Sequence, residues 1–261
     1  MMMNKKGLVY KIIERFLSCF TDKIVCISKA EYVSAIENGI DNGKKLEIIE
    51  NGIDVRAVQR AQAVDRESLG IPYNAFVVGM IGRISPQKAP DTFINAAYLI
   101  NKKIPNTYYI IVGSGEDEEN IKQEAEKMGV NLIVTGWTDK PYSYLKIFDV
   151  AVLLSRWEGF GLAIAEYMAA EKNFVATNVD AIPTIVSDGI DGELVNVDSP
   201  QEVADKVYYY YTHPMEAAEI REKAKKKVVE KYDISRVVQQ HKKMFEELYN
   251  GKKSIEKQMS N

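Results

Sequence analysis

Two glutamates, Glu158 and Glu166, have the surroundings in this sequence that most strongly suggest chemistry. Both lie in the stretch SRWEGFGLAIAEYMAAE, residues 155–171, which from Gly161 to Ala170 is small or apolar except for Tyr167 and Glu166. A carboxylate in apolar surroundings needs hydrogen-bond donors, and the vicinal hydroxyls of a ribose would supply them. Glu158 precedes the expected helix on its ligand side, where it would meet a second set of hydroxyls.

The glycines around Phe160 predict an anion-binding turn before that helix. Gly159 and Gly161 flank Phe160, and the helix is expected to begin near Gly161. The first backbone amides, from Gly161 to Ile164, would have no partner within the helix, and a phosphate is the natural guest there. The alternative is a surface helix with two incidental glutamates, which the apolar neighbours of Glu166 disfavour.

Two cations form a second candidate anion site. Arg83 and Lys88 stand in the stretch RISPQK, directly after a strand that ends at Gly82, and Lys88 lies at the entry to a helix. Together with the free amides of that helix they would bind an anion. The alternative interpretation, two ordinary surface cations, stays open for this stretch taken by itself.

Two further strands also end in glycine-containing loops. Gly113 and Gly115 of GSGEDEEN allow close approach of a ligand to the backbone, but the dinucleotide fingerprint needs a third glycine where Glu118 stands. The acidic run there also suits the first turn of a helix. The stretch TGW, which contains Gly136 and Trp137, could offer a backbone edge to a base.

The elements that must position these residues alternate between strand-like and helix-like patterns. Short apolar runs without alternation predict parallel strands at 23–28, 46–50, 76–82, 107–113, 131–136, 149–155 and 174–179. Helical stretches are expected at 89–102, 117–128, 141–147 and 161–171, and then only helices from 200 to about 249. This order predicts an α/β fold, a Rossmann-like doubly wound parallel sheet with a helical C-terminal tail. Ligands of such sheets bind beyond the carboxyl ends of the strands.

Composition excludes several classes of function. The chain has 261 residues and a formal net charge of −3, so there is no bulk basic signal for nucleic acid. Its two cysteines and two histidines have no metal-site spacing, which predicts no metal. No stretch reaches the roughly 20 apolar residues that a bilayer span needs. The first helix has an apolar stripe, for which core packing is expected and a membrane-surface helix is the alternative: Leu8, Val9, Ile12, Ile13, Phe16, Leu17 and Phe20.

The order of these motifs resembles the carboxyl-terminal, donor-binding domain of GT-B glycosyltransferases, specifically the large retaining family numbered four, the glycosyl transferases of group 1. The resemblance extends from about Lys23 to Tyr249. Its motifs are NGID (51–54), GRISPQK (82–88), VGSGE (112–116), VTGW (134–137), SRWEGFGLAIAEYMAA (155–170) and DGIDGELV (188–195).

The resemblance implies a role for each charged residue. Arg83 and Lys88 would hold the diphosphate and stabilise its charge as it departs, Glu166 would bind the ribose hydroxyls, and Glu158 would orient the transferred sugar. Arg83, Lys88 and Glu158 are therefore the expected catalytic residues. The implied donor-binding set contains Glu166 and also Gly82, Gly113, Ser114, Gly115, Gly136, Trp137, Gly159, Phe160, Gly161 and Leu162.

The implied reaction is that of a retaining, hexosyltransferase-type enzyme, which moves a sugar from a UDP- or GDP-sugar to a hydroxyl of a carbohydrate or lipid-linked acceptor. No cofactor or metal is expected, because cations and helix amides would balance the leaving diphosphate. Surface polysaccharide or glycolipid synthesis is the expected pathway. The expected location is cytoplasmic, with weak peripheral association at the inner membrane face. The sequence departs from the family pattern at Ala89, Asp180, Ala181 and Thr184.

The resemblance also implies a domain organisation. Residues 1–54 would be a remnant of the amino-terminal acceptor domain, 55–235 the nucleotide-sugar donor-binding domain, and 236–261 a crossing-back helix with a frayed tail. Because most of the acceptor domain is missing, the isolated chain would be inactive, and exposed apolar surface would seek an acceptor-domain partner or a homodimer. A non-catalytic nucleotide-sugar-binding subunit is one alternative. A nucleotide-sugar epimerase is a weaker one, because both histidines lie in the helical tail.

Overall fold

The computed structural model describes residues 5–259, with side chains from 8 to 251. Its contacts divide the chain into two compact units. The first unit consists of Met1–Gly52 and Tyr232–Asn261, and the second unit of Ile53–Lys231. The predicted assignment of residues 1–54 to an acceptor domain and of 55–235 to a donor domain remains a prediction.

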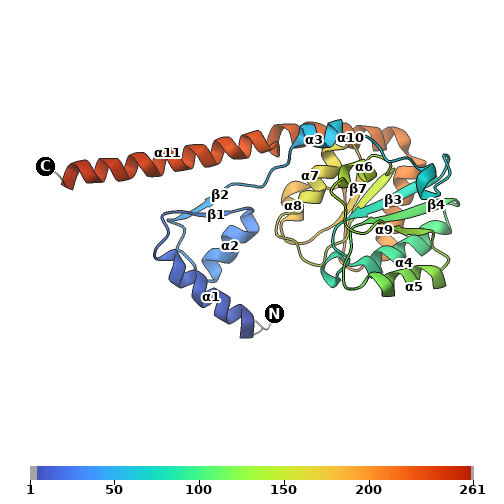
Figure 1. Ribbon diagram of the computed structural model, residues 1–261, viewed down its shortest axis with the longest axis horizontal. Coiled ribbons are helices and arrows are strands. Elements are labelled where there is room, and N and C mark those ends of the chain that lie inside the picture. The colour runs from blue at the N-terminus through green and yellow to red at the C-terminus, as the bar shows by residue number, and fades with distance from the viewer. Residues whose placement is uncertain (1–4, 260–261) are drawn as a thin grey trace. The chain divides into compact units, whose positions relative to one another are not determined.

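The second unit is built on a parallel sheet, which within the described residues has six strands (Figure 1). Its strands are β3 (Phe76–Ile81), β4 (Thr107–Val112), β5 (Leu132–Val134), β6 (Val150–Leu153), β7 (Asn173–Thr177) and β8 (Glu193–Val195). They lie in the order β5-β4-β3-β6-β7-β8. This is the doubly wound order, whose direction reverses between β3 and β6. The predicted fold class is confirmed.

Helices cover both faces of this sheet (Figure 1). One face carries α4 (Pro90–Asn101), α5 (Glu118–Lys127) and α9 (Pro200–Thr212). The other carries α3 (Val55–Arg60), α6 (Pro141–Leu145) and α7 (Leu162–Ala169), while α10 (Pro214–Lys231) contacts both α7 and α9. A short helix, α8 (Ile182–Ile185), follows β7. Because both faces are covered, the four middle residues of β3 and all of β6 and β7 are buried.

The close packing of the second unit requires one glycine within a strand. A side chain at Gly79, in the middle of β3, would overlap the ring of Phe148. Phe148 is fully buried and stands just before β6, the strand that pairs with β3 through Val78–Val150 and Gly79–Ala151. The glycine therefore lets the connection into β6 approach β3, which brings the ends of these two strands together.

The first unit contains α1 (Lys5–Ser18), β1 (Ile24–Cys26), α2 (Lys29–Glu37), β2 (Leu46–Ile48) and α11 (Ile234–Met259). Strands β1 and β2 pair in parallel, and Ser28 caps α2 by accepting a hydrogen bond from the Glu31 amide. Helix α11 extends through Met259, and the fraying predicted for this tail remains a prediction. Good helix formers such as Lys252 and Glu256 outnumber the single Gly251 there. Residues 260 and 261 lie outside the described residues.

The apolar stripe of α1 does not pack in a core, so that prediction is wrong. All seven residues of the stripe are exposed, from 46% for Ile13 to 76% for Phe20. The β1–β2 pair is too small a sheet to cover an amphipathic helix. Among the described residues, no helix is long and apolar enough to cross a membrane.

Candidate functional site

The site lies at the carboxyl ends of β3 and β6, where the strand order reverses. The loop after β3 contains Gly82 and an exposed Arg83, and then turns through a short 3₁₀ helix, Pro86–Lys88, into α4. Ala89 holds the left-handed conformation at this junction, with φ of 49°. The loop after β6 contains Glu158 and leads into α7. Both loops reach the crevice that doubly wound sheets use for ligands.

The two loops are joined by an ion pair. The Nζ atom of Lys88 lies 2.5 Å from Oε2 of Glu158, and the two side chains are 18% and 13% exposed. Oε2 also accepts a hydrogen bond from the Ser155 hydroxyl at 3.1 Å. The structure thus brings together two residues that were predicted separately, one for the diphosphate and one for the sugar. In this arrangement each side chain neutralises the charge of the other.

Asp180, which follows β7, also contacts Glu158. Its Oδ2 accepts a hydrogen bond from the Glu158 backbone amide at 2.9 Å. Asp180 is exposed and has a left-handed φ of 48°. The sequence marks Asp180 only as a departure from the family pattern. The structure adds that its carboxylate accepts a hydrogen bond from a backbone amide of the site.

Arg156 holds the same two loops together, and sequence reasoning missed it. Its Nη1 donates to the Pro86 carbonyl at 2.8 Å and its Nη2 to Asp91 at 2.6 Å. Its Nε donates to Asp198 at 2.8 Å. The only local signal was its place next to the glutamate loop, and its partners lie far away along the chain. Arg156 therefore fixes the turn that carries Lys88.

Replacing Arg156 by methionine is expected to lower the free energy of unfolding by about 2 kcal/mol, because two charge-assisted hydrogen bonds and one to a carbonyl are lost from a mostly shielded side chain. Urea denaturation of the variant and the wild type measures this. The control is Arg56→Met, since Arg56 is exposed on α3. Equal losses in the two variants would contradict the role given to Arg156.

A cavity of about 360 Å³ opens beside these loops. Five predicted residues line it, namely Gly82, Arg83, Gly113, Ser114 and Trp137, and with them lie Ile81, Val112, Thr138 and Pro141. The cavity is therefore formed by the ends of β3 and β4 and by the segment after β5. A lining that combines glycine backbone, a guanidinium and an 80% exposed indole suits a planar base joined to an anion.

The glycines of this cavity are required by the backbone. Gly113 has a φ of 146°, and a side chain on it would overlap the Gly82 carbonyl. A side chain on Gly115 would overlap the Ile84 carbonyl, while Gly136 forms a bridge with Gly113. Gly115 and Gly136 thus support the cavity without lining it.

Glu166 is half-buried on α7, in agreement with its apolar surroundings. The Tyr142 hydroxyl donates a hydrogen bond to Glu166 Oε1 at 3.1 Å. Burial raises the pKa of Glu166, and the hydrogen bond from Tyr142 opposes that rise. Burial and the charge of Glu166 raise the pKa of Tyr142 to about 12. Tyr142 was not predicted, since nothing local distinguishes it from the other tyrosines.

The turn before α7 differs in one respect from the prediction. Gly161 is the N-cap in a left-handed conformation, Phe160 is buried, and Gly159 and Leu162 are exposed. The prediction that the amides up to Ile164 are free is wrong for Ile164, because its amide donates to the Gly161 carbonyl at 2.9 Å. A tight first turn of this kind satisfies an amide that would otherwise remain free.

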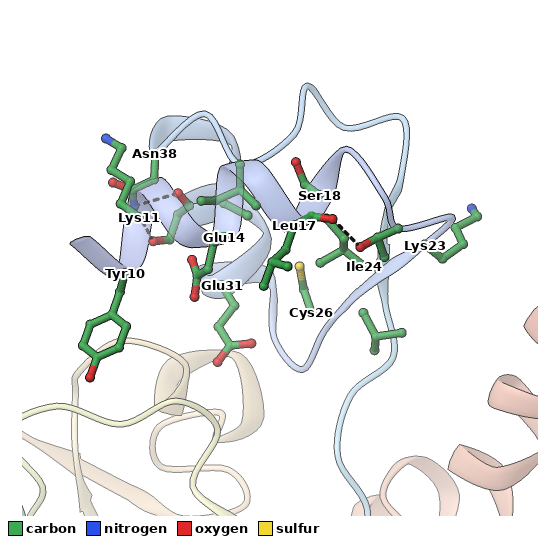
Figure 2. A pocket seen from close by; sticks show the side chains of 15 residues that line it. Tyr10, Lys11, Glu14, Leu17, Ser18, Lys23, Ile24, Cys26, Glu31 and Asn38 are labelled. Carbon is green, nitrogen blue, oxygen red and sulfur yellow. Dashed lines mark hydrogen bonds between the residues drawn. The ribbon is translucent and has the colours of Figure 1, made fainter. Parts of the chain in front are cut away.

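A second cavity, of about 690 Å³, lies within the first unit and is lined from α1, β1 and α2 (Figure 2). Its lining includes side chains of both signs of charge, with Lys11 and Glu14 on α1 and Glu31 on α2. Oε2 of Glu31 accepts a hydrogen bond from the Ile27 amide at 3.1 Å. Burial, and then the charge of Glu31, raise the pKa of the Cys26 thiol. Its lining comes from residues 10–40, whereas every predicted site residue lies between 82 and 166.

Among the side chains of residues 8–251, no group of three or more histidines, cysteines, aspartates or glutamates is placed to hold a metal ion.

A parallel sheet in this order, with helices on both faces, defines a Rossmann-like domain. Residues 61–227 match the family model described as Glycosyl transferases group 1. The chain therefore belongs to this family, and the predicted resemblance is confirmed.

Known relatives agree with this membership. The UDP-Gal:alpha-D-GlcNAc-diphosphoundecaprenol alpha-1,3-galactosyltransferase of Escherichia coli is 32% identical over 199 residues, which are 73% of this chain and 51% of that protein. The chain spans about half the length of the curated relatives it matches (51%, 57% and 55% of the first three).

Solved structures show the same fold. The carboxyl-terminal domain of a group 1 glycosyl transferase (LpcC) from Francisella tularensis is similar with a TM-score of 0.63 and 28% identity, over 70% of this chain and all of that one. Anabaena Alr3699/HepE in complex with UDP and glucose gives a TM-score of 0.84 with 21% identity, over 94% of this chain and 67% of that one.

Proposed function

We propose that this chain binds the nucleotide-sugar donor of a retaining group 1 glycosyltransferase. The observation that supports this most is the cavity at the ends of β3 and β4, which is lined by Arg83 and by glycine backbone next to the Lys88–Glu158 pair. The base would lie against Trp137, the diphosphate against Arg83, and the ribose hydroxyls at Glu166. The names of two relatives, one of which uses UDP-Gal and one of which binds UDP and glucose, favour a UDP-sugar over a GDP-sugar.

The ion pair suggests how the donor would be received. The diphosphate would draw Lys88 away from Glu158, because two phosphate charges compete with one carboxylate. Glu158 would then be free to accept hydrogen bonds from the hydroxyls of the sugar. Binding would therefore prepare the cation and the carboxylate in the same step.

The reaction itself requires one bond to break and one to form at the anomeric carbon of the sugar. The bond to the phosphate oxygen breaks, and the nucleoside diphosphate leaves with its charge stabilised by Arg83 and Lys88. The acceptor hydroxyl forms the new bond on the same face, which retains the configuration, and its proton passes to the departing phosphate. Glu158 orients the sugar and forms no covalent intermediate.

Replacing Glu166 by glutamine tests the donor-binding proposal. UDP, UDP-glucose and GDP are titrated into the wild type by calorimetry. We expect the protein to bind the nucleotides of one base, uracil or guanine, and not those of the other. The variant should bind that nucleotide about 10- to 100-fold more weakly, because hydrogen bonds to a charged acceptor are replaced by weaker ones.

The control for this experiment is Glu119→Gln, since the Glu119 side chain is 82% exposed on α5. It should bind as the wild type does. Failure of the wild type to bind either nucleotide would refute the proposal, and so would unchanged affinity in Glu166→Gln.

The finer proposals concern the acceptor and the partner. The acceptor would be a carbohydrate or a lipid-linked sugar in surface polysaccharide synthesis on the cytoplasmic side, since the Escherichia coli relative acts on a diphosphoundecaprenol-linked sugar. The exposed stripe on α1 favours a second candidate, a donor-binding subunit that needs a separate acceptor-domain protein. Binding without transfer, rescued by such a partner, would distinguish it from a self-sufficient enzyme.

A further inference from the structure

Tyr142 is a polar residue of the site to which neither the motifs nor the comparisons assign a role. It lies in α6, directly after Pro141, which lines the 360 Å³ cavity. Its hydroxyl reaches across to α7 and donates to Oε1 of Glu166 at 3.1 Å. No other hydrogen bond to the Glu166 carboxylate is present among the described residues, so Oε2 keeps its acceptor capacity.

The geometry of this contact limits how Glu166 can move. A glutamate side chain has three rotatable bonds, and a half-buried one with no partner would be free to turn between several rotamers. A hydrogen bond from a hydroxyl on a neighbouring helix selects one of them and occupies one oxygen. The second oxygen is then presented in a fixed direction to whatever enters the site.

We propose that Tyr142 is a positioning residue, which orients the Glu166 carboxylate so that its second oxygen accepts hydrogen bonds from the vicinal hydroxyls of a ribose. The proposal rests on the donor-binding function above, and it adds the residue on which discrimination between ribose and deoxygenated sugars depends. Tyr142 itself touches neither the diphosphate nor the transferred sugar in this scheme.

The electrostatic surroundings of Glu166 are consistent with this role. The titratable groups that interact with it are Tyr142 from α6 and Tyr167 from its own helix, and Asp54 at the N-cap of α3 acts on Tyr142. Burial raises the pKa of Glu166, and the Tyr142 hydroxyl is the group that lowers it. Removing that hydroxyl should therefore raise the pKa of Glu166 further.

Dissociation constants for two ligands test the proposal, and calorimetry measures them. The ligands are the nucleoside diphosphate that the wild type binds, UDP or GDP, and its 2′,3′-dideoxy analogue. We expect Tyr142→Phe to weaken binding of the ribonucleotide about tenfold and to leave the affinity for the dideoxy analogue unchanged. In a Glu166→Gln background, the same substitution should have no further effect on either ligand, since the residue acts through Glu166.

The pH dependence of nucleotide affinity gives a second test, because a purely structural role of Tyr142 would not change it. The ionised carboxylate accepts hydrogen bonds from the hydroxyls more strongly than the protonated acid does, so affinity for the ribonucleotide should fall as the pH drops through the pKa of Glu166. In Tyr142→Phe that fall should begin at a higher pH than in the wild type. The dideoxy analogue should show no such difference between the two proteins.

The matched control is Tyr144→Phe, because Tyr144 is also half-buried on the same helix and its hydroxyl makes no hydrogen bond among the described residues. It should behave as the wild type with both ligands. Equal weakening of both ligands by Tyr142→Phe would overturn the proposal, and so would unchanged or tighter ribonucleotide binding. If the wild type binds neither UDP nor GDP, the donor-binding function fails first, and the positioning role fails with it.

Discussion

Replacing Lys88 by methionine will lower the free energy of unfolding by about 3 kcal/mol, which for a unit of this size corresponds to a fall of about 6–12 °C in Tm. The reason is that the Glu158 carboxylate, which is largely shielded from water, loses its cationic partner at 2.5 Å. Ser155 can donate to it, but the neighbouring Asp180 is a second carboxylate. Scanning calorimetry without ligand measures the effect.

A double-mutant cycle isolates the ion pair from other effects of the substitution. Lys88→Met with Glu158→Gln should recover most of the lost stability, since no uncompensated charge remains. Lys122→Met is the matched control, because Lys122 also forms a 2.5 Å pair, with Glu118, but on the exposed surface of α5. It should show no resolvable change in Tm. Equal Tm values for Lys88→Met and the wild type would contradict the shielded pair.

The same variant should also lose function. Nucleoside diphosphate affinity should fall about tenfold or more, because the diphosphate loses a cation that it would otherwise take from Glu158. Glu158→Gln should instead leave the affinity for the diphosphate unchanged or improve it, since Lys88 no longer has to be drawn away. Titration of both variants with the same nucleotide checks this opposite pair of outcomes.

Replacing Gly113 by alanine will cost about 3 kcal/mol of stability and abolish measurable nucleotide binding. Two effects add: a left-handed φ of 146°, and overlap of the new side chain with the Gly82 carbonyl. The Gly82 carbonyl belongs to the backbone, so it cannot move away from the new side chain as the end of a flexible side chain could. The register at the ends of β3 and β4 must therefore shift, including the hydrogen bond from the Gly82 amide to the Val112 carbonyl. The cavity is built on that edge.

Gly129→Ala is the control for this prediction. Gly129 also has a positive φ, of 65°, but no atom lies within 4 Å of the position a side chain would take. It should cost only about 1 kcal/mol, the backbone strain by itself, and should leave nucleotide binding intact. Urea denaturation and nucleotide titration of both variants separate strain from overlap. If Gly113→Ala has the same stability and the same nucleotide affinity as Gly129→Ala, the overlap is relieved by a local shift and the prediction is wrong.

The strands of the second unit show how far local pattern determines a fold. The apolar runs at 76–82, 107–113, 149–155 and 174–179 predict β3, β4, β6 and β7, because a strand covered on both faces is apolar along most of its length. β8 was missed, since its three residues begin with Glu193. That carboxylate is tolerated in the sheet because Lys206 of α9 pairs with it, and no local pattern contains that partner.

What the sequence determined by itself was the sheet, its flanking helices and the loops in which polar residues gather. These follow from periodicity and from glycine and proline positions, which act over a few residues. The tertiary structure decided which groups meet: Lys88 with Glu158, Tyr142 with Glu166, and Arg156 with Asp91 and Asp198. It also left the α1 stripe exposed. The physical reason is that these contacts depend on strand order and on the approach of loops far apart in the chain. Periodicity shows only that a helix or strand has an apolar face, and not which element that face meets.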